Sequence, residues 1–265
     1  METKVAIVTG ASSGIGKCVA EELVSCGIKV YDFSRRKTAH VPGIEYIATD
    51  VTDPKNIDES FNAVLVKEGK TDILINCAGF GISGAIEFTS LEEAKSQFEV
   101  NFFGMTNMCR AILPQMRKRG EGRIVNISSV AAPCAIPFQA YYSASKSAIN
   151  TYTAALANEV KPYGITVTVV QPGDICTGFT EARKKSCAGD EEYGGRVHRS
   201  VAKMEDDEKN GMNPGAAAKY IVKIALKRKV KPIYTIGFTY KAICVLCKLL
   251  PCGFLNYLIY RLYAE

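Results

Sequence analysis

Short runs of apolar and β-branched residues alternate along the chain with longer stretches in which apolar residues recur every three or four positions. The short runs are typical of strands buried on both faces, and the longer stretches of amphipathic helices. The predicted strands are Lys4–Thr9, Lys29–Ser34, Glu45–Ala48, Ile73–Asn76, Arg123–Ile127, Thr166–Gln171 and Pro232–Thr235. The predicted helices are Gly14–Cys26, Pro54–Lys67, Leu91–Lys118, Ala140–Val160 and Pro214–Leu226. This alternation predicts an α/β fold, with one doubly wound parallel sheet of about seven strands and helices on both faces.

Neither a repeat nor a linker interrupts the alternation, so residues 1–265 are predicted to form a single domain. Residues 177–211 break the pattern because they are polar and irregular, with Gly189, Gly194 and Gly195 and an acidic cluster at positions 205–208. A loop of this length in a compact domain is usually a functional lid or a disordered stretch. We expect an irregular segment that serves as a substrate lid.

The C-terminal segment, residues 238–263, is rich in Leu, Ile, Cys and Tyr. Lys241, Lys248 and Pro251 interrupt it, so it falls short of a membrane span. Three placements stay open: packing on the core, covering the active site, or lying on a bilayer surface. The expectation is that it folds back near the lid and helps to close an apolar pocket.

Composition narrows the classes of function. The chain has 265 residues, is 47% hydrophobic and 23% charged, and carries a net charge of +6, which is ordinary for a globular domain. Its Lys and Arg residues are scattered, so no nucleic-acid partner is expected. Because the N-terminus leads straight into a strand, we expect a cytoplasmic protein with ten free thiols. Cys244, Cys247 and Cys252 lie among apolar residues far from either His, so no metal site is expected.

A glycine-rich turn follows the first predicted strand and opens the first predicted helix. It reads Thr9 to Gly16, with glycines in the spacing G-x-x-x-G-x-G. Glycines allow a backbone to approach phosphate groups closely, and a helix N-terminus offers free N–H groups and a positive dipole end. The turn therefore predicts a dinucleotide site. The residues expected to bind there are Gly10, Ser12, Ser13, Gly14, Ile15 and Gly16.

A phenol and an ammonium group share one face of a later predicted helix. Tyr142 and Lys146 are four residues apart, which places their side chains together, whereas Tyr141 is five residues from Lys146 and points elsewhere. A free phenol has a pKa near 10, and a nearby positive charge favours the phenolate form. This pair is suited to moving a proton to or from an alcohol.

The two motifs, in this order and about 130 residues apart, resemble the short-chain dehydrogenase/reductase (SDR) family in its classical subgroup. The resemblance covers about residues 4 to 235, and it is weaker toward hydroxysteroid and retinol dehydrogenases. Further landmarks in the family's order are Asp50, Asn76-Cys77-Ala78-Gly79, Asn101, Ser128-Ser129 and Pro172-Gly173. The resemblance implies a Rossmann-type fold and an oxidoreductase that acts on CH–OH groups with a nicotinamide cofactor.

The resemblance also implies catalytic roles. Tyr142 would exchange the proton, Lys146 would hold the nicotinamide ribose, and Ser129 would hydrogen-bond the substrate oxygen. Asn101 would hold a water that relays protons to Lys146. Ser128 should point to the opposite side from Ser129.

The end of the second strand decides between the two nicotinamide cofactors. The family's discriminating acidic residue would fall at Ser34, Arg35 follows it, and Asp32 is two residues too early. An Arg pairs with a 2′-phosphate, so NADP(H) is favoured, although Arg35 and Arg36 could also be a solvated pair of loop charges.

Other cofactor contacts are implied by family position. Asp50 and Val51 would contact the adenine, and Pro172, Gly173 and Thr177 the nicotinamide carboxamide. Asn76, Ala78 and Gly79 would line the cofactor or steady the central strand, and a structural role in a turn stays open for Asp50 too.

The sequence is thus interpreted as an NADP(H)-dependent oxidoreductase that moves a hydride between nicotinamide and a carbonyl or secondary alcohol. The expected pocket walls are apolar or aromatic, which suits a lipophilic, steroid-like or retinoid-like substrate. These walls are Phe80, Cys134, Ile136, Pro137, Phe138, Tyr141 and Phe179. The alternatives are a sugar substrate, an acyl-carrier substrate, or a non-catalytic NADP(H)-binding regulator. A homodimer or homotetramer through the helices that carry Asn101 and Tyr142 is also expected.

Overall fold

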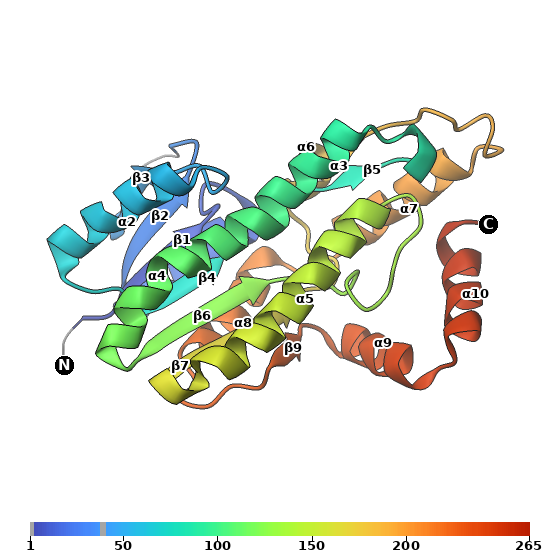
Figure 1. Cartoon of the computed structure of the whole chain (residues 1–265). Coiled ribbons are helices and arrows are strands. Elements are labelled where there is room, and N and C mark those ends of the chain that lie inside the picture. The colour runs from blue at the N-terminus through green and yellow to red at the C-terminus, as the bar shows by residue number, and fades with distance from the viewer. Residues whose placement is uncertain (1–2, 38–40) are drawn as a thin grey trace.

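A seven-stranded parallel sheet forms the centre of the protein (Figure 1). The structure is a computed structural model that describes residues 3–37 and 41–265. The strand order is β3-β2-β1-β4-β6-β7-β9, and every neighbouring pair is parallel. The strands are β1 (Val5–Thr9), β2 (Lys29–Ser34), β3 (Ile44–Ala48), β4 (Ile73–Asn76), β6 (Gly122–Ile127), β7 (Ile165–Gln171) and β9 (Ile233–Thr235). All seven predicted strands are confirmed within one residue at each end.

Helices cover both faces of the sheet, which confirms the doubly wound, Rossmann-type α/β fold. One face packs against α1 (Gly14–Ser25) and α8 (Pro214–Ala225) through a buried apolar cluster. The opposite face packs against α2 (Pro54–Glu68), α4 (Met105–Arg119) and α5 (Ala140–Val160). Two short 3₁₀ turns, η1 (Ile86–Phe88) and η3 (Lys161–Tyr163), lie in connections.

Two of these helices start with the same sequence signal. Asp53 before α2 and Asn213 before α8 each accept hydrogen bonds from two backbone N–H groups of the first turn. In both cases proline follows at the first helical position, where its missing N–H costs nothing. These Asx-Pro starts explain why both helix beginnings could be predicted from the sequence.

The predicted helix Leu91–Lys118 is interrupted. It consists of α3 (Leu91–Phe98), a π-helical turn (η2, Glu99–Gly104) and α4. Asn101 lies in the π-helical turn and is buried. π-Helical turns occur frequently at functional sites, because the extra residue redirects the side chains around it.

The expectation that residues 177–211 are irregular is wrong. This segment contains α6 (Phe179–Ala182), β8 (Lys184–Lys185) and the 14-residue helix α7 (Arg196–Lys209). The strand β8 pairs with β5 (Ile82–Ser83) outside the main sheet. Helix α7 buries Val197, Val201 and Met204 against Phe138. Those three positions have helical spacing, but the many charged residues around them hide the pattern.

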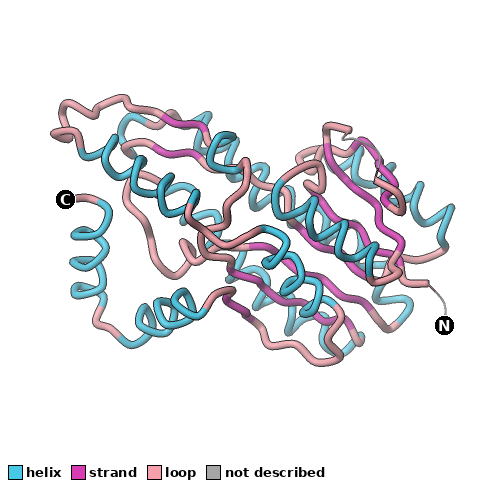
Figure 2. The backbone as a smooth tube through the Cα atoms, turned by 180° about the vertical axis from the view of Figure 1, so that it is seen from behind, coloured by secondary structure: helices cyan, strands magenta, loops and turns pink. Residues whose placement is uncertain are grey.

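The C-terminal segment forms two helices joined at Pro251: α9 (Phe238–Leu249) and α10 (Cys252–Tyr263). They lie at one edge of the molecule and run in different directions (Figures 1 and 2). Hydrogen bonds tie them to the body, from the Tyr240 hydroxyl to Asp174, from the Cys244 thiol to Gln171, and from the Tyr263 hydroxyl to Asp207 on α7. Within the described ranges, none of the helices combines the length and the apolar character that crossing a membrane requires.

Candidate active site

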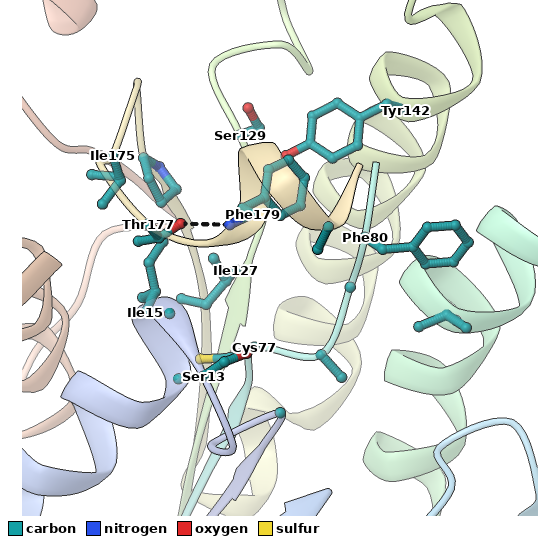
Figure 3. Close-up of a pocket in the computed structure, with 18 of the residues that line it drawn as sticks. Ser13, Ile15, Cys77, Phe80, Ile127, Ser129, Tyr142, Ile175, Thr177 and Phe179 are labelled. Carbon is teal, nitrogen blue, oxygen red and sulfur yellow. Dashed lines mark hydrogen bonds between the residues drawn. The ribbon is translucent and has the colours of Figure 1, made fainter. Parts of the chain in front are cut away.

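A cavity of about 860 Å³ opens at the carboxyl ends of β1, β4, β6 and β7. Ligands of open parallel sheets bind at this edge. Figure 3 shows side chains from these loops and from the lid pointing into the space. Of the predicted site residues, all line the cavity except Asn76 and Asn101.

The glycines of the turn after β1 are required by packing within the protein, and they also suit the close approach of a phosphate group. Gly10 has φ +68°, and a Cβ there would lie 2.9 Å from the Ala78 Cα. A Cβ on Gly16 would overlap the Gly10 carbonyl oxygen. Both glycines are therefore required by close approaches within the protein. Ser13 precedes α1 without capping it through its side chain, which leaves N–H groups of the first helical turn available beside the cavity.

The Asp32 side chain stabilises the glycine-rich turn by a hydrogen bond. Its buried carboxylate accepts a hydrogen bond from the Ala11 backbone and lies 3.1 Å from the Ser34 hydroxyl. Burial raises the pKa of Asp32 above its usual range. The side chain does not line the cavity, which confirms that Asp32 lies within the strand. The cavity end beside Ser34 is instead lined by Arg35 and Arg36, both exposed.

Asp50 and Val51 line the cavity next to that end. The Asp50 carboxylate accepts hydrogen bonds from the Thr52 backbone and hydroxyl, at 2.9 and 2.8 Å. Val51 packs closely on Gly104 at the end of the π-helical turn. Asp50 thus has the structural turn role that the sequence left open, in a place where it also borders the cavity.

Asn76 has a structural position rather than one in the cavity wall. Its amide donates a 2.8 Å hydrogen bond to Asn126 on β6, and Asn126 donates to Thr153 on α5 at 2.9 Å. All three residues are buried. Two roles were left open for Asn76, and these hydrogen bonds fit the one in which it stabilises the central strand. The adjacent Cys77, Ala78 and Gly79 do line the cavity.

Tyr142 and Ser129 meet in the cavity (Figure 3). Burial raises the pKa of Tyr142 to about 12, and a hydrogen bond with the Ser129 side chain opposes that rise. The phenol is therefore protonated at neutral pH. The sequence led us to expect that Lys146 lowers the pKa of this phenol. The structure does not place the two groups for this, because the Lys146 ammonium lies over the face of the Tyr142 ring, 5.6 Å from its centroid.

Lys146 is only 6% exposed, and its ammonium donates a 3.0 Å hydrogen bond to the Ile127 carbonyl oxygen. Burial lowers the pKa of Lys146 to about 8. The Lys146 backbone carbonyl accepts a 2.9 Å hydrogen bond from Ser128. Ser128 thus holds the helix, and like Ser129 it borders the cavity.

Asn101 ties the loop after β4 to α5. Its side-chain oxygen accepts from the Phe80 backbone N–H, and its amide donates to the Phe80 carbonyl oxygen, both at 3.0 Å. The same amide lies 3.2 Å from the Ser145 hydroxyl. A Cβ on Gly79 would be 3.1 Å from the Asn101 oxygen and 3.7 Å from the Lys146 nitrogen, so the two side chains border the same glycine. A proton relay through Asn101 stays a prediction.

Pro172, Gly173 and Thr177 line the cavity after β7. The Pro172 carbonyl oxygen accepts from the Val130 N–H at 3.0 Å, and the Thr177 hydroxyl accepts from the Phe179 N–H at 3.2 Å (Figure 3). Gly173 lies so close to the Tyr240 ring that any Cβ there would collide with it. The C-terminal segment therefore packs directly behind this loop.

The substrate side of the cavity differs from the expectation. Phe80, Ile136 and Phe179 line it as predicted, with the Phe179 ring 5.8 Å from that of Tyr142. Four of the expected wall residues do not line it: Cys134, Pro137, Phe138 and Tyr141. Phe138 is instead buried under α7, because its backbone adopts a positive φ of 59° that turns the side chain toward the lid.

Sequence reasoning missed the charged groups of the lid. Glu208 at the end of α7 lines the cavity, pairs with the buried Arg183, and accepts a 2.6 Å hydrogen bond from Thr180. Lys184 also lines the cavity. The 24 residues between Arg183 and Glu208 carry no motif, so only the fold of this segment brings the pair together.

The expectation of free thiols is confirmed, because all ten cysteines are unpaired. Within residues 3–37 and 41–265, no group of three or more His, Cys, Asp or Glu side chains is placed to hold a metal ion.

The arrangement matches a known family. A model of the short chain dehydrogenase family matches residues 4–188. The chain belongs to this family. A relative, the 3-ketodihydrosphingosine reductase of Bacteroides thetaiotaomicron, is 40% identical over 246 residues, which cover 90% of this chain and 91% of the relative. The 3-oxoacyl-[acyl-carrier-protein] reductase FabG of Vibrio cholerae is 35% identical over 189 residues, 69% of this chain and 78% of the relative.

Solved structures of the family share the fold. A short-chain dehydrogenase from Streptomyces avermitilis superposes with a TM-score of 0.84 at 32% identity, covering 98% of this chain and 95% of its own. ElxO with NADP bound has a TM-score of 0.76 at 25% identity, covering 91% and 100%. The 3-ketoacyl-(acyl-carrier-protein) reductase of Brucella melitensis complexed with NADH has a TM-score of 0.75 at 25% identity, covering 89% and 97%. The SDR protein described here is therefore an oxidoreductase of a family whose members bind NAD(P)(H).

Tyr142→Phe keeps the ring and removes the proton. We expect its turnover to fall by at least about a hundredfold, the low end for a positioned acid–base group, while NADPH binding is retained. Tyr141→Phe, in which the neighbouring phenol is removed, should change turnover little. Steady-state rates together with fluorescence titration of NADPH measure both effects. If Tyr141→Phe were the inactive variant, the assignment of the helix face would be wrong.

The pH dependence of ketone reduction should report Lys146. Because its pKa is lowered to about 8, the ammonium is present below that pH and is lost as pH rises through it. We therefore expect kcat/KM to fall as pH rises above about 8, whereas Tyr142, with a pKa of about 12, stays protonated. Lys146→Arg provides the control, because a guanidinium does not titrate here and the descending limb should vanish. A profile that stays level well above pH 8 in the unmodified enzyme would contradict this assignment.

Proposed function

We propose that this SDR protein uses NADPH to reduce a ketone on a long-chain, lipophilic substrate. The observation that carries the proposal is the protonated Tyr142 beside Ser129, within a cavity walled by Phe80, Ile136 and Phe179. A protonated phenol can donate its proton to a carbonyl oxygen that becomes an alcohol. Aromatic and aliphatic walls suit an apolar chain next to that carbonyl.

The roles of the side chains follow from their positions. When bound, the reduced nicotinamide supplies the hydride that is added to the carbonyl carbon. Ser129 donates a hydrogen bond that holds the carbonyl oxygen near Tyr142, and Tyr142 delivers its proton to that oxygen. Lys146, charged below about pH 8, would hold the ribose hydroxyls of the cofactor and would favour the phenolate left after the transfer. The Asn101 side chain, which borders Gly79 with Lys146, completes the relay that returns a proton from solvent.

Selection of NADPH rests on the cavity end after β2. Ser34 offers no carboxylate to the ribose 2′-hydroxyl, and the Asp32 carboxylate is used inside the protein by the Ala11 backbone. Arg35 and Arg36 supply two positive charges where a 2′-phosphate would lie. The bound NADP of ElxO supports this choice, whereas the NADH of the Brucella reductase represents the alternative.

For the substrate, the first candidate is 3-ketodihydrosphingosine, a long-chain ketone. The 40% identity to a reductase of that compound spans nine-tenths of both chains. A 3-oxoacyl thioester is the second candidate, supported by the likeness to FabG and to the Brucella reductase. Assembly as a homodimer or homotetramer and a cytoplasmic location stay predictions.

The substrate is tested by NADPH oxidation over a panel of 3-ketodihydrosphingosine, a short-chain analogue, a 3-oxoacyl thioester and an aldose. We expect kcat/KM for the long-chain ketone to exceed that for the short analogue by at least about tenfold, because each buried CH₂ contributes roughly 0.8 kcal/mol. Tyr142→Phe supplies the background rate. Preference for the thioester would replace the first candidate by the second, and inactivity with every carbonyl would favour a non-catalytic binding protein.

The cofactor preference is tested by Arg35→Ala. Loss of a charge-assisted pair should weaken NADPH binding by roughly 1.5–3 kcal/mol and leave NADH binding nearly unchanged. Lys37→Ala is the matched control, because Lys37 is an exposed cation two residues away that does not line the cavity. Calorimetric titration with both cofactors measures the difference. Equal efficiency of the unmodified enzyme with NADH and NADPH would count against NADPH selection.

A further inference from the structure

The exposed apolar side chains of the protein gather on its C-terminal helices. Among the described residues, nine of the seventeen exposed large apolar side chains belong to residues 238–262. Those of α9 are Phe238, Val245, Leu246 and Leu249, which recur at i, i+7, i+8 and i+11 and so form one stripe. Phe238 is 88% exposed and Leu249 73%. Soluble proteins rarely leave such a continuous patch uncovered.

Helix α10 repeats this arrangement. Phe254, Tyr257, Leu258 and Leu262 are exposed at i, i+3, i+4 and i+8, again on one side of the helix. The opposite sides face the protein, because Cys244 of α9 and Ile259 of α10 are buried. Each helix is also anchored by a tyrosine hydroxyl, Tyr240 on Asp174 and Tyr263 on Asp207. The two helices are therefore held in place with an apolar stripe turned outward.

The charges beside the stripes indicate what covers them. Lys241 and Lys248 are exposed on α9, and neither α9 nor α10 contains Asp or Glu. Arg261 of α10 is exposed as well but already pairs with Glu265, at 2.7 Å. In a twofold contact between two copies through α9, the two lysines of each copy would meet with no carboxylate on that helix between them. A surface rich in anionic headgroups pairs with them instead, and aromatic residues such as Phe254, Tyr257 and Tyr260 suit the boundary between headgroups and acyl chains.

We propose that α9 and α10 lie flat on an anionic lipid bilayer and dock the enzyme there. Each helix has 12 residues, which is long enough for an interfacial helix and too short for a span. Tyr240 of α9 packs directly on Gly173, which lines the cavity. Docking by these helices therefore brings the rim of the cavity at Gly173 close to the membrane, from which a lipophilic ketone can enter.

The test is co-sedimentation of the full-length protein with vesicles, in the absence of substrate. One set contains equal parts of phosphatidylcholine and phosphatidylglycerol, and the other contains phosphatidylcholine alone. We expect the partition coefficient to be at least about tenfold higher for the anionic vesicles, and to fall in high salt. Vesicle binding does not depend on turnover. A protein that fails to bind vesicles would therefore contradict the docking proposal alone, and the proposed reductase activity is tested by its own assay.

Matched variants locate the docking face. Phe238→Ser, Leu249→Ser and Leu262→Ser combined should lower anionic-vesicle binding by at least about tenfold. The control combines Val66→Ser, Ile86→Ser and Leu91→Ser, whose side chains are equally exposed, at 89%, 58% and 61%, but lie elsewhere. Lys241→Glu with Lys248→Glu should abolish the preference for anionic lipid, and it tests the charges without changing the apolar stripe. Circular dichroism verifies folding of each variant.

Three outcomes would overturn the proposal. The first is equal vesicle binding by the unmodified protein and the α9–α10 variant. The second is equal binding to anionic and neutral vesicles. The third is a dimer, detected by light scattering, that dissociates in the α9–α10 variant while no vesicle binding is seen, which would make a second copy the occupant of this face.

Discussion

The attachment of α5 to the end of β6 is the constraint on which the site depends. Three buried hydrogen bonds make it: Asn126 to Thr153, Ser128 to the Lys146 carbonyl oxygen, and the Lys146 ammonium to the Ile127 carbonyl oxygen. An unmade buried polar contact costs about 1–3 kcal/mol, so sliding or rotating the helix is strongly disfavoured. This attachment sets the distance between Tyr142, carried by the helix, and Ser129, carried by the strand end. Asn76 extends the same chain of bonds to β4.

Burial has opposite effects on the two titrating groups of the site. It raises the pKa of Tyr142 to about 12 and lowers the pKa of Lys146 to about 8, so both shifts favour the neutral form. The phenol therefore holds its proton at neutral pH. The ammonium, with a pKa of about 8, donates to the Ile127 carbonyl oxygen. Ser129 is the polar contact that opposes the rise in the pKa of the phenol.

The sheet, most helices and the cofactor loops could be predicted because each depends on local patterns. Asp53-Pro54 and Asn213-Pro214 mark helix starts, and the glycines after β1 mark a turn that no other residue fits. The π-helical turn at Asn101 could not be predicted from helical periodicity, because it changes the hydrogen-bonding register without changing residue types. Helix α7 was missed because its apolar positions are outnumbered by charged ones, and the placement of Phe138 under it depends on a backbone twist with no sequence signal.

The site, too, has one part that local sequence patterns specify and one part that they do not. Its cofactor side is made of loops that each follow directly from a strand of the sheet, so a motif a few residues long specifies each wall. Its substrate side is made by contacts between distant segments: Arg183 with Glu208, Thr180 with Glu208, and Tyr240 with Asp174. Such contacts are tertiary and can change without affecting the sheet, because the lid and the C-terminal helices pack on its rim. The proposed substrate side is therefore built by the part of the chain that motifs describe least, and the proposed proton-transfer residues stand on the part that they describe best.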